Sequence, residues 1–425
     1  MPTAIVIGGG LAGISAAAAL GGAGFEVELF EARPFLGGRA ASYRVWPDAG
    51  PIDNCQHVLL ACFTNLLNLY ERLGVSSRIA FHREFNFIEP GGRRSVLRAG
   101  PLPAPAHLMG SLLRVAFLDG ADKMAIARAV SAVAGEWRRG DLDSITMLDW
   151  LRQRHQPQRA IDRFWKQVLV SAVNEDLDRM AARHGLQVIR TGFLSSRRAY
   201  QMGLATAPLG ELYADMHLHG VKVRLGQPVE RVSETGVVTA GGEHRADYYV
   251  LAVPFHRVAS IAPDLNVDVS QFEHSPITGI HLWFSDPIMD LPHATLLDRT
   301  VQWAFNKRAG KYVQLVVSAS RSLVEMPRAE VIHLAVRELA EFFPKAGRAA
   351  LERAHVVKEL RATFSARPGL EAARPVARTA VPNLFLAGDW TKTGWPSTME
   401  GAVRSGYLAA EAVTAAAGKA RRFLA

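Results

Sequence analysis

The stretch Ala4–Gly13, AIVIGGGLAG, decides the fold that we expect for this chain. Its first four residues are apolar and partly β-branched, which predicts a buried parallel strand. Gly8, Gly10 and Gly13 follow at once and give the pattern G-x-G-x-x-G. The small residues of Ile14–Ala23 predict a helix, so the glycines stand where a strand turns into a helix. There the backbone can approach a pyrophosphate, and the helix N-terminus offers free N–H groups.

A second predicted strand, Glu26–Phe30, ends beside an acid about 20 residues beyond the glycines, where a ribose-binding carboxylate is expected. A lone G-x-G-x-x-G would be a weak signal, because glycines also serve close packing of a helix on a strand. Strand, helix, second strand and acid together predict a dinucleotide-binding Rossmann unit. Its predicted cofactor-binding residues are Gly8, Gly10, Leu11, Ala12, Gly13, Glu31 and Ala32.

The next segment, Glu31–Ala40, reads EARPFLGGRA and helps to choose between a nicotinamide and a flavin. Gly37 and Gly38 let the chain fold back close to a ligand, and Arg39 can meet a phosphate or a ribose. With this segment the chain resembles the superfamily of flavin-dependent amine oxidases and phytoene desaturases. The resemblance implies that Gly37, Gly38 and Arg39 continue an FAD site.

The C-terminal part resembles the same superfamily. Asn383–Trp390, NLFLAGDW, and Gly394–Ala402, GWPSTMEGA, look like the motif that closes the FAD site. A helix predicted to begin near its end would point its N-terminus at the flavin, where the helix dipole favours the anionic reduced ring. The residues that the resemblance assigns to FAD here are Gly388, Asp389, Thr398 and Met399, together with Val229, whose backbone would meet the adenine.

The segment Asp53–Leu60, DNCQHVLL, places polar side chains between apolar ones, which is costly unless they find partners. With the FAD motifs and the overall length, it resembles the hydroxysqualene dehydroxylases, in which a glycine is common at the position of Cys55. That resemblance implies reductive removal of a hydroxyl group from hydroxysqualene to give squalene. An acid must protonate the allylic hydroxyl, since hydroxide is a poor leaving group. The predicted catalytic candidates are Asp53, His57 and Glu400.

Each candidate acid has a plain structural alternative. Asp53 could hold loop N–H groups, His57 could be a hydrogen-bonded core histidine, and Glu400 could cap its own helix. The rival functions are a carotenoid or phytoene-type desaturase, which runs the flavin in the oxidising direction, a flavin amine oxidase with an aromatic cage, and a noncatalytic scaffold that binds FAD or lipid. The sequence does not identify the electron donor.

Composition favours a folded enzyme. The chain has 425 residues, of which 49% are hydrophobic and 21% charged, so it can form two domains with sizeable cores. No stretch reaches the roughly 18 apolar residues of a spanning helix. Two cysteines without zinc-type spacing predict free thiols, no metal site and a cytoplasmic location. The net charge of +9 leaves contact with the inner face of a membrane open, while scattered arginines without stacking aromatics disfavour nucleic acid.

The predicted fold class is α/β, with a Rossmann-type FAD-binding domain and a discontinuous α+β substrate domain. The FAD-binding domain would comprise residues 1–62, 206–268 and 366–425, and the substrate domain residues 63–205 and 269–365. We expect residues 63–205 to be mostly helical, with helices at 121–137 and 147–154, and a further helix at 204–220. We expect an antiparallel sheet with strands at 278–284, 301–305 and 312–317, followed by a helix at 328–343.

Two apolar segments could serve a lipophilic substrate. Gly91–Leu118 is broken by prolines and accompanied by arginines, and reads either as a lipid-touching entrance or as a buried helix with its lead-in. In Phe164–Asn174, the side chains of Trp165, Val168 and Leu169 are candidates for a hydrophobic substrate wall, with core packing as the alternative.

Overall fold

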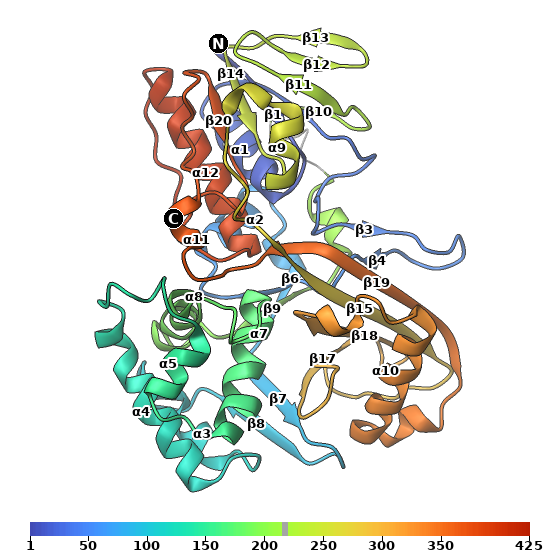
Figure 1. Cartoon of the computed structure of the whole chain (residues 1–425). Helices are drawn as coiled ribbons and strands as arrows, with labels where there is room; N and C mark the ends of the chain where they lie inside the picture. The colour runs from blue at the N-terminus through green and yellow to red at the C-terminus, as the bar shows by residue number, and fades with distance from the viewer. Residues whose placement is uncertain (215–219) are drawn as a thin grey trace.

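The computed structural model describes residues 1–214 and 220–425, arranged as two halves that long strands connect (Figure 1). The first half is built on a parallel sheet in the order β10-β2-β1-β14-β20. Its strands are β1 (Thr3–Ile7), β2 (Glu26–Phe30), β10 (Val221–Arg224), β14 (Tyr248–Leu251) and β20 (Leu384–Leu386). The predicted Rossmann unit is confirmed, because β1, α1 (Leu11–Gly22) and β2 follow one another with the glycine turn between the first two.

The two faces of this sheet carry different layers, and β1 shows how its sequence achieves this. Ala4 and Val6 pack with the helices α1, α2 (Thr64–Arg72) and α12 (Met399–Ala416). Ile5 and Ile7 point the other way and share a core with the three-stranded meander. Because successive side chains of a strand alternate between faces, a strand covered on both sides must be apolar throughout. The meander consists of β11 (Val229–Val232), β12 (Val237–Thr239) and β13 (Gly242–His244).

Helix α12 brings the C-terminal motif against the glycine turn. Gly406 of α12 faces α1 so closely that a Cβ atom would overlap the carbonyl oxygen of Ala12 and the hydroxyl of Ser15. The Ser15 hydroxyl donates to the carbonyl of Val403 at 3.2 Å. The small residues of both helices therefore allow the two ends of the chain to meet at one site.

The second half contains a seven-stranded sheet in the order β19-β15-β18-β17-β16-β7-β8. Neighbouring strands pair antiparallel except β16 and β7, which pair parallel. The predicted antiparallel sheet is thus confirmed, and β15 and β19 extend from it toward the first half (Figure 1). The strands are β7 (Glu84–Ile88), β8 (Arg94–Arg98), β15 (His274–Phe284), β16 (His293–Leu296), β17 (Trp303–Arg308), β18 (Tyr312–Ser318) and β19 (Leu351–Phe364).

The region 63–205 is less helical than predicted. The β7–β8 hairpin lies inside it, and its turn contains Gly91 and Gly92, both with positive φ. A small sheet in the order β5-β9-β6 is formed by β5 (Val58–Leu60), β6 (Ile79–His82) and β9 (Met202–Ala205). These strands are short, so their alternation is hard to distinguish from one face of a helix. The helix predicted at 204–220 is wrong, since the segment starts in β9 and continues as one 3-10 turn, Leu209–Leu212; residues 215–219 lie outside the described part.

Helices cover the remaining surfaces. The helices predicted at 121–137, 147–154 and 328–343 are confirmed as α4, α5 and α10. Both α4 and α5 begin with a capping box, Asp119 with Asp122 and Thr146 with Asp149. The second half and its connections contain α3 (Met109–Arg114), α4 (Gly120–Glu136), α5 (Met147–Gln153), α6 (Gln158–Ala160), α7 (Lys166–Val173), α8 (Ala182–Gln187), α10 (Arg328–Phe342) and α11 (Leu370–Ala373), with π-helical turns at Ile161–Trp165 and Val188–Leu194. In the first half, α9 (Phe255–Ile261) packs against β11 (Figure 1).

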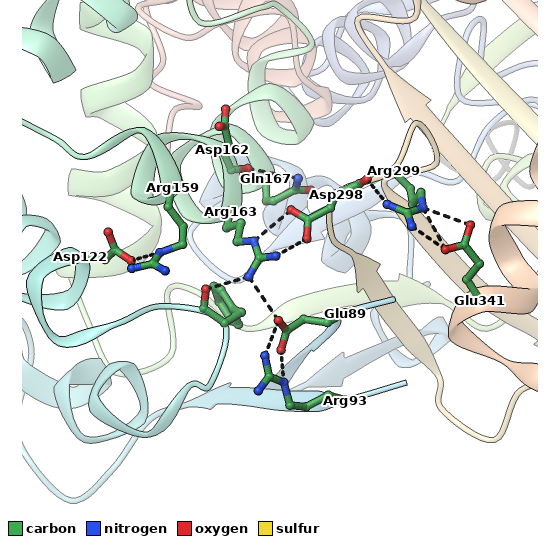
Figure 2. A network of polar contacts seen from close by, with 11 residues as sticks. Glu89, Arg93, Asp122, Arg159, Asp162, Arg163, Gln167, Asp298, Arg299 and Glu341 are labelled. Carbon is green, nitrogen blue, oxygen red and sulfur yellow. Dashed lines mark hydrogen bonds and ion pairs between the residues drawn. The ribbon is translucent and has the colours of Figure 1, made fainter. Parts of the chain in front are cut away.

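A polar network fastens the helices of the second half to its sheet (Figure 2). Arg163 donates to Asp298 at 2.5 and 3.0 Å, to Glu89 at 3.2 Å and to the carbonyl of Phe117 at 3.2 Å. Glu89 also binds Arg93. One guanidinium therefore joins the turn before α7 to the β7–β8 hairpin and to the loop after β16.

We propose the two-domain division given above, with one change at its first boundary, where α2 packs with the first half. Leu66, Leu69 and Tyr70 of α2 share the core of α1 and α12, so α2 lies with the first half although it follows residue 62. Within the described ranges, no helix combines the length and the apolar composition that crossing a bilayer requires. Cys55 and Cys62 are free thiols, as predicted, and burial raises the pKa of each to about 12.

Candidate functional site

A cavity of about 730 Å³ is lined by residues from both halves of the molecule. One limb runs along the glycine turn and the C-terminal motif, and the other continues between the seven-stranded sheet and the helices of the second half. All the residues predicted to bind FAD line this cavity except Gly13.

Close backbone approach explains the glycine turn. A Cβ atom on Gly13 would overlap the carbonyl oxygen of Gly8, and one on Gly8, whose φ is +107°, would meet the carbonyl oxygen of Ala252 at 2.5 Å. Gly13 therefore packs α1 on β1, and its role is structural. A Cβ atom on Gly10 would find its nearest neighbour 3.9 Å away, and Gly10 caps α1 without a side-chain hydrogen bond. The turn thus leaves room and free N–H groups for a diphosphate.

Glu31 is tied to the same turn. One carboxylate oxygen accepts from the backbone N–H of Gly9 at 2.6 Å, and the other accepts from that of Arg33 at 2.8 Å. Each oxygen keeps a further lone pair for a ribose hydroxyl. Because Gln227, Pro228 and Val229 line the same end of the cavity, this end fits an adenosine.

Arg39 and Asp389 join the two cofactor motifs. Their side chains are 2.5 Å apart, and Arg39 also donates to the carbonyl of Ala362 at 2.8 Å. The Ser397 hydroxyl donates to the second carboxylate oxygen of Asp389. Burial alone would raise the pKa of Asp389, but the Arg39 guanidinium and the Ser397 hydroxyl outweigh it and hold that pKa below its usual range. The pair places an ionised carboxylate where the superfamily resemblance implies the FAD chain.

His57 is the one acid candidate that lines the cavity. Its Nδ1 lies 2.9 Å from the carbonyl oxygen of Cys55, which fixes the ring and requires a proton on that nitrogen. Burial lowers the pKa of His57, so the neutral ring is the resting form. No hydrogen bond within the described residues uses Nε2, which leaves this atom for a ligand.

Asp53 sits behind the cavity wall. It is buried and accepts from the Ser42 hydroxyl at 2.7 Å, the Leu209 N–H at 3.0 Å and the Lys307 ammonium at 3.2 Å. Lys307 also donates to Gln56 at 3.0 Å, and Gln56 lines the cavity. Asp53 therefore orders the segment that carries His57. This arrangement matches the structural alternative for Asp53, a carboxylate that holds loop N–H groups.

Glu400 also lies outside the cavity lining, and it caps a helix other than its own. Its carboxylate accepts from the Leu66 N–H at 2.8 Å and from the Asn65 side chain at 2.7 Å, both in the first turn of α2. Its own helix is capped by Thr398, whose hydroxyl accepts from Gly401 at 3.0 Å. Burial raises the pKa of Glu400 although these donors act against the shift.

The second limb of the cavity is mainly apolar, with a few polar side chains such as Gln167, Ser171, Thr191 and Ser318. Strand β7 contributes Phe85 and Phe87, and β17 contributes Trp303 and Phe305. Of the three predicted wall residues in Phe164–Asn174, Val168 lines this limb, whereas Trp165 and Leu169 are fully buried in the core. Further apolar lining comes from α7, the second π-helical turn, β9, β15 and β18, through Ala172, Val188, Phe193, Met202, Ile277 and Val316.

Several lining residues could not be found from sequence motifs. The aromatic side chains of β7 were not predicted to line a site, because they lie in a region that was predicted to be helical. Phe85, Phe87 and the turn glycines after them nevertheless form a pattern that indicates a strand. His256 and Arg257 of α9, His274 of β15 and Arg361 of β19 also line the cavity, and no local pattern marks them. Strand pairing and helix packing alone bring them together.

Known proteins match this chain over almost its full length. The family model described as flavin containing amine oxidoreductase matches residues 11–414. A protein named hydroxysqualene dehydroxylase from Rhodopseudomonas palustris is 30% identical over 438 residues, which cover 97% of this chain and 99% of that protein. A 15-cis-phytoene desaturase of an Oncidium hybrid cultivar is 25% identical to this chain. The match covers 96% of this chain and 77% of that protein.

The fold has a solved counterpart. An oxidoreductase from Methanosarcina mazei superposes with a TM-score of 0.73 at 18% identity, over 95% of this chain and 98% of that one. The likeness concerns the fold, and it extends across both halves of the molecule.

Proposed function

This chain belongs to the flavin-containing amine oxidoreductase family, and from that premise we propose that it is a reductive dehydroxylase which converts hydroxysqualene to squalene. Its cofactor is FAD, which the glycine turn, Glu31 and the Arg39–Asp389 pair are built to hold. The observation that carries the proposal is the cavity itself, because the limb that continues from the cofactor limb is walled mainly by aromatic and aliphatic side chains, with Gln167, Ser171, Thr191 and Ser318 as polar members of its lining.

The chemistry requires a dry site with one proton donor. The reaction breaks a C–O bond, forms a C–H bond and releases water, so it consumes a hydride equivalent and a proton. FAD, when bound in its reduced form, supplies the hydride equivalent. The aromatic and aliphatic walls exclude water from the allylic cation that forms when the hydroxyl leaves.

His57 fits the role of the proton donor. Its Nδ1–H is held by the Cys55 carbonyl, so a second proton must reside on Nε2, the atom left for a ligand. A lowered pKa makes the protonated ring a stronger acid, at the expense of a smaller protonated fraction at neutral pH. Asp53 and Lys307 act on His57 indirectly. Lys307 donates to both Asp53 and Gln56 and so holds in place the segment that carries His57.

An amine substrate finds less support. Among the described residues, the acids that line the cavity are Glu31, Asp389 and Glu359, and each is already hydrogen-bonded. The apolar limb offers no carboxylate to pair with an ammonium. Phe63 and Trp395, which line the cavity, meet at 90° and therefore do not form parallel walls of an aromatic cage.

Desaturation of a polyene is the second candidate. It is favoured by the similarity to phytoene desaturases and needs the same apolar limb, but it runs the flavin in the oxidising direction. The direction of the reaction distinguishes the two candidates experimentally.

The lipophilic substrate also suggests contact with a membrane surface. Met109 and Leu113 lie one turn apart on α3 and are 41% and 62% exposed, and the exposed Arg114 ends the same helix. Apolar side chains flanked by a cation suit a bilayer with anionic headgroups. Strand β8, against which α3 packs, pairs with β7 of the cavity wall. We therefore infer that α3 rests on the membrane from which the substrate enters.

The decisive experiment mixes the photoreduced holoenzyme with hydroxysqualene under anaerobic conditions. Flavin absorbance is followed in a stopped-flow instrument, and the extracted products are identified by mass spectrometry. Flavin reoxidation with stoichiometric squalene is expected. If the reducible flavin stays reduced, the dehydroxylase proposal is refuted, and the oxidised enzyme is then tested with phytoene-like polyenes and with amines.

A further inference from the structure

Four basic side chains converge at one place on the cavity, from elements far apart in sequence. His256 and Arg257 stand in the first turn of α9, His274 begins β15, and Arg361 lies near the end of β19. The rings of His256 and His274 are 5.1 Å apart, and Phe255 stacks on His274 at 4.4 Å. We call these four basic residues the basic cluster.

An irregularity in strand pairing aims Arg361 at the cavity. Ser275 pairs with Thr363 and Ile277 with Glu359, so three residues of β19 stand opposite the single residue Pro276 of β15. Such a bulge redirects side chains, and bulges gather beside active sites. The same bulge presents the carbonyl of Ala362 to Arg39, which links it to the cofactor limb.

The basic cluster carries charge without partners. Within residues 1–214 and 220–425, neither Arg257 nor Arg361 forms an ion pair, although both are exposed and line the cavity. The Nδ1 atoms of His256 and His274 are buried without a hydrogen-bond partner. Burial, and after it the charge of the neighbouring Arg361, lowers the pKa of both imidazoles. The adjacent Asp389 is already neutralised by Arg39.

We propose that the basic cluster binds the diphosphate group of a dinucleotide at the mouth of the cavity. Guanidinium groups match phosphate geometry, and a neutral imidazole can donate one further hydrogen bond. The diphosphate has two sources. It belongs either to FAD, held from the side opposite the glycine turn, or to a reduced nicotinamide dinucleotide that passes its hydride to the flavin. The second source rests on the proposed reductive function, whereas the first does not.

The test compares the double variant R257Q/R361Q with the wild-type holoprotein. The matched control is R348Q, which removes an exposed arginine that lines no part of the cavity. FAD dissociation on dilution is measured by the fluorescence of the released flavin, and anaerobic reduction by NADPH and NADH is measured by stopped-flow absorbance. Far-UV circular dichroism checks that each variant is folded. None of these measurements uses hydroxysqualene, so their failure is separate from a failure of the proposed reaction.

The two measurements, FAD dissociation and reduction by NADPH or NADH, distinguish the two sources of the diphosphate. If it belongs to FAD, the dissociation constant for FAD rises about tenfold for each arginine removed, and the effect shrinks at high salt. If it belongs to the electron donor, FAD affinity is kept while the concentration of NADPH or NADH for half-maximal reduction rises by a similar factor. The proposal is overturned if both quantities stay within twofold of wild type, or if R348Q changes them equally.

Discussion

Replacing Glu400 by glutamine distinguishes a helix cap from a catalytic acid. The carboxylate accepts hydrogen bonds at 2.7 and 2.8 Å from the first turn of α2, and a glutamine keeps one acceptor oxygen but turns an N–H₂ group toward the second donor. Hydrogen bonds to a charged acceptor contribute about 1.5–3 kcal/mol each. We expect E400Q to lower the free energy of unfolding by about 1–3 kcal/mol, and Glu400→Ala by more, since both donors would then be left buried.

The assay pairs urea unfolding with turnover at saturating substrate. A capping role predicts turnover within about twofold of wild type, whereas loss of a general acid would reduce it by about 10²-fold or more. Glu338 offers a matched control, because its buried carboxylate also accepts two hydrogen bonds, from the backbone N–H groups of Thr300 and Val301. It lies on α10 and does not line the cavity. Unchanged stability with a large loss of turnover in E400Q, and no such loss in E338Q, would refute the capping assignment.

The pKa of Glu400 adds a pH dependence. Because burial raises this pKa in the folded state, the group binds a proton more readily there than in the unfolded chain. Protonated Glu400 therefore stabilises the folded protein at pH values below the pKa that this residue has in the unfolded chain. This contribution is lost as the pH rises through the pKa that Glu400 has in the folded protein. The stability of wild type relative to E400Q should therefore fall as pH rises above about 4.5. A relative stability that rises instead would contradict a raised pKa.

Three further changes test other parts of the site. His57→Ala should lower turnover at saturating substrate by about 10²-fold while the FAD content of the purified protein, read from its absorbance, stays unchanged. Arg39→Met removes the guanidinium that pairs with the buried carboxylate of Asp389; we expect weaker FAD binding and a free energy of unfolding in urea that is lower by about 1.5–3 kcal/mol. The double change of Met109 and Leu113 to serine should weaken sedimentation with anionic vesicles about tenfold without affecting flavin reduction; equal sedimentation would disprove the contact at α3.

The sequence predicted the strand, turn and helix of the Rossmann unit correctly because their signals are local. A strand, a glycine turn and a helix N-terminus are consecutive in the chain, and Gly8 must adopt a positive φ wherever the rest of the protein lies. The motif at Gly388 and Asp389 works the same way, and the fold brings both ends together through the small residues of α1 and α12. The strands and helices around these motifs were predicted to within a few residues.

The strands inside 63–205 were missed for a physical reason. A strand of four or five residues shows too few alternations to differ from a helix turn, and β7 becomes a strand because β8 and β16 pair with it. The apolar limb depends on that pairing, since Phe85 and Phe87 line it only in this register.

The roles of the polar side chains were decided by tertiary structure. Asp53, His57 and Glu400 were all candidates in the sequence, because each is a titratable group that could protonate the allylic hydroxyl. Only the folded chain shows that Glu400 meets the start of α2, more than 300 residues away, and that Asp53 meets Lys307 behind the wall. A side chain's chemistry depends on its partners, and long-range packing sets those partners, whereas a glycine turn carries its geometry within its own few residues.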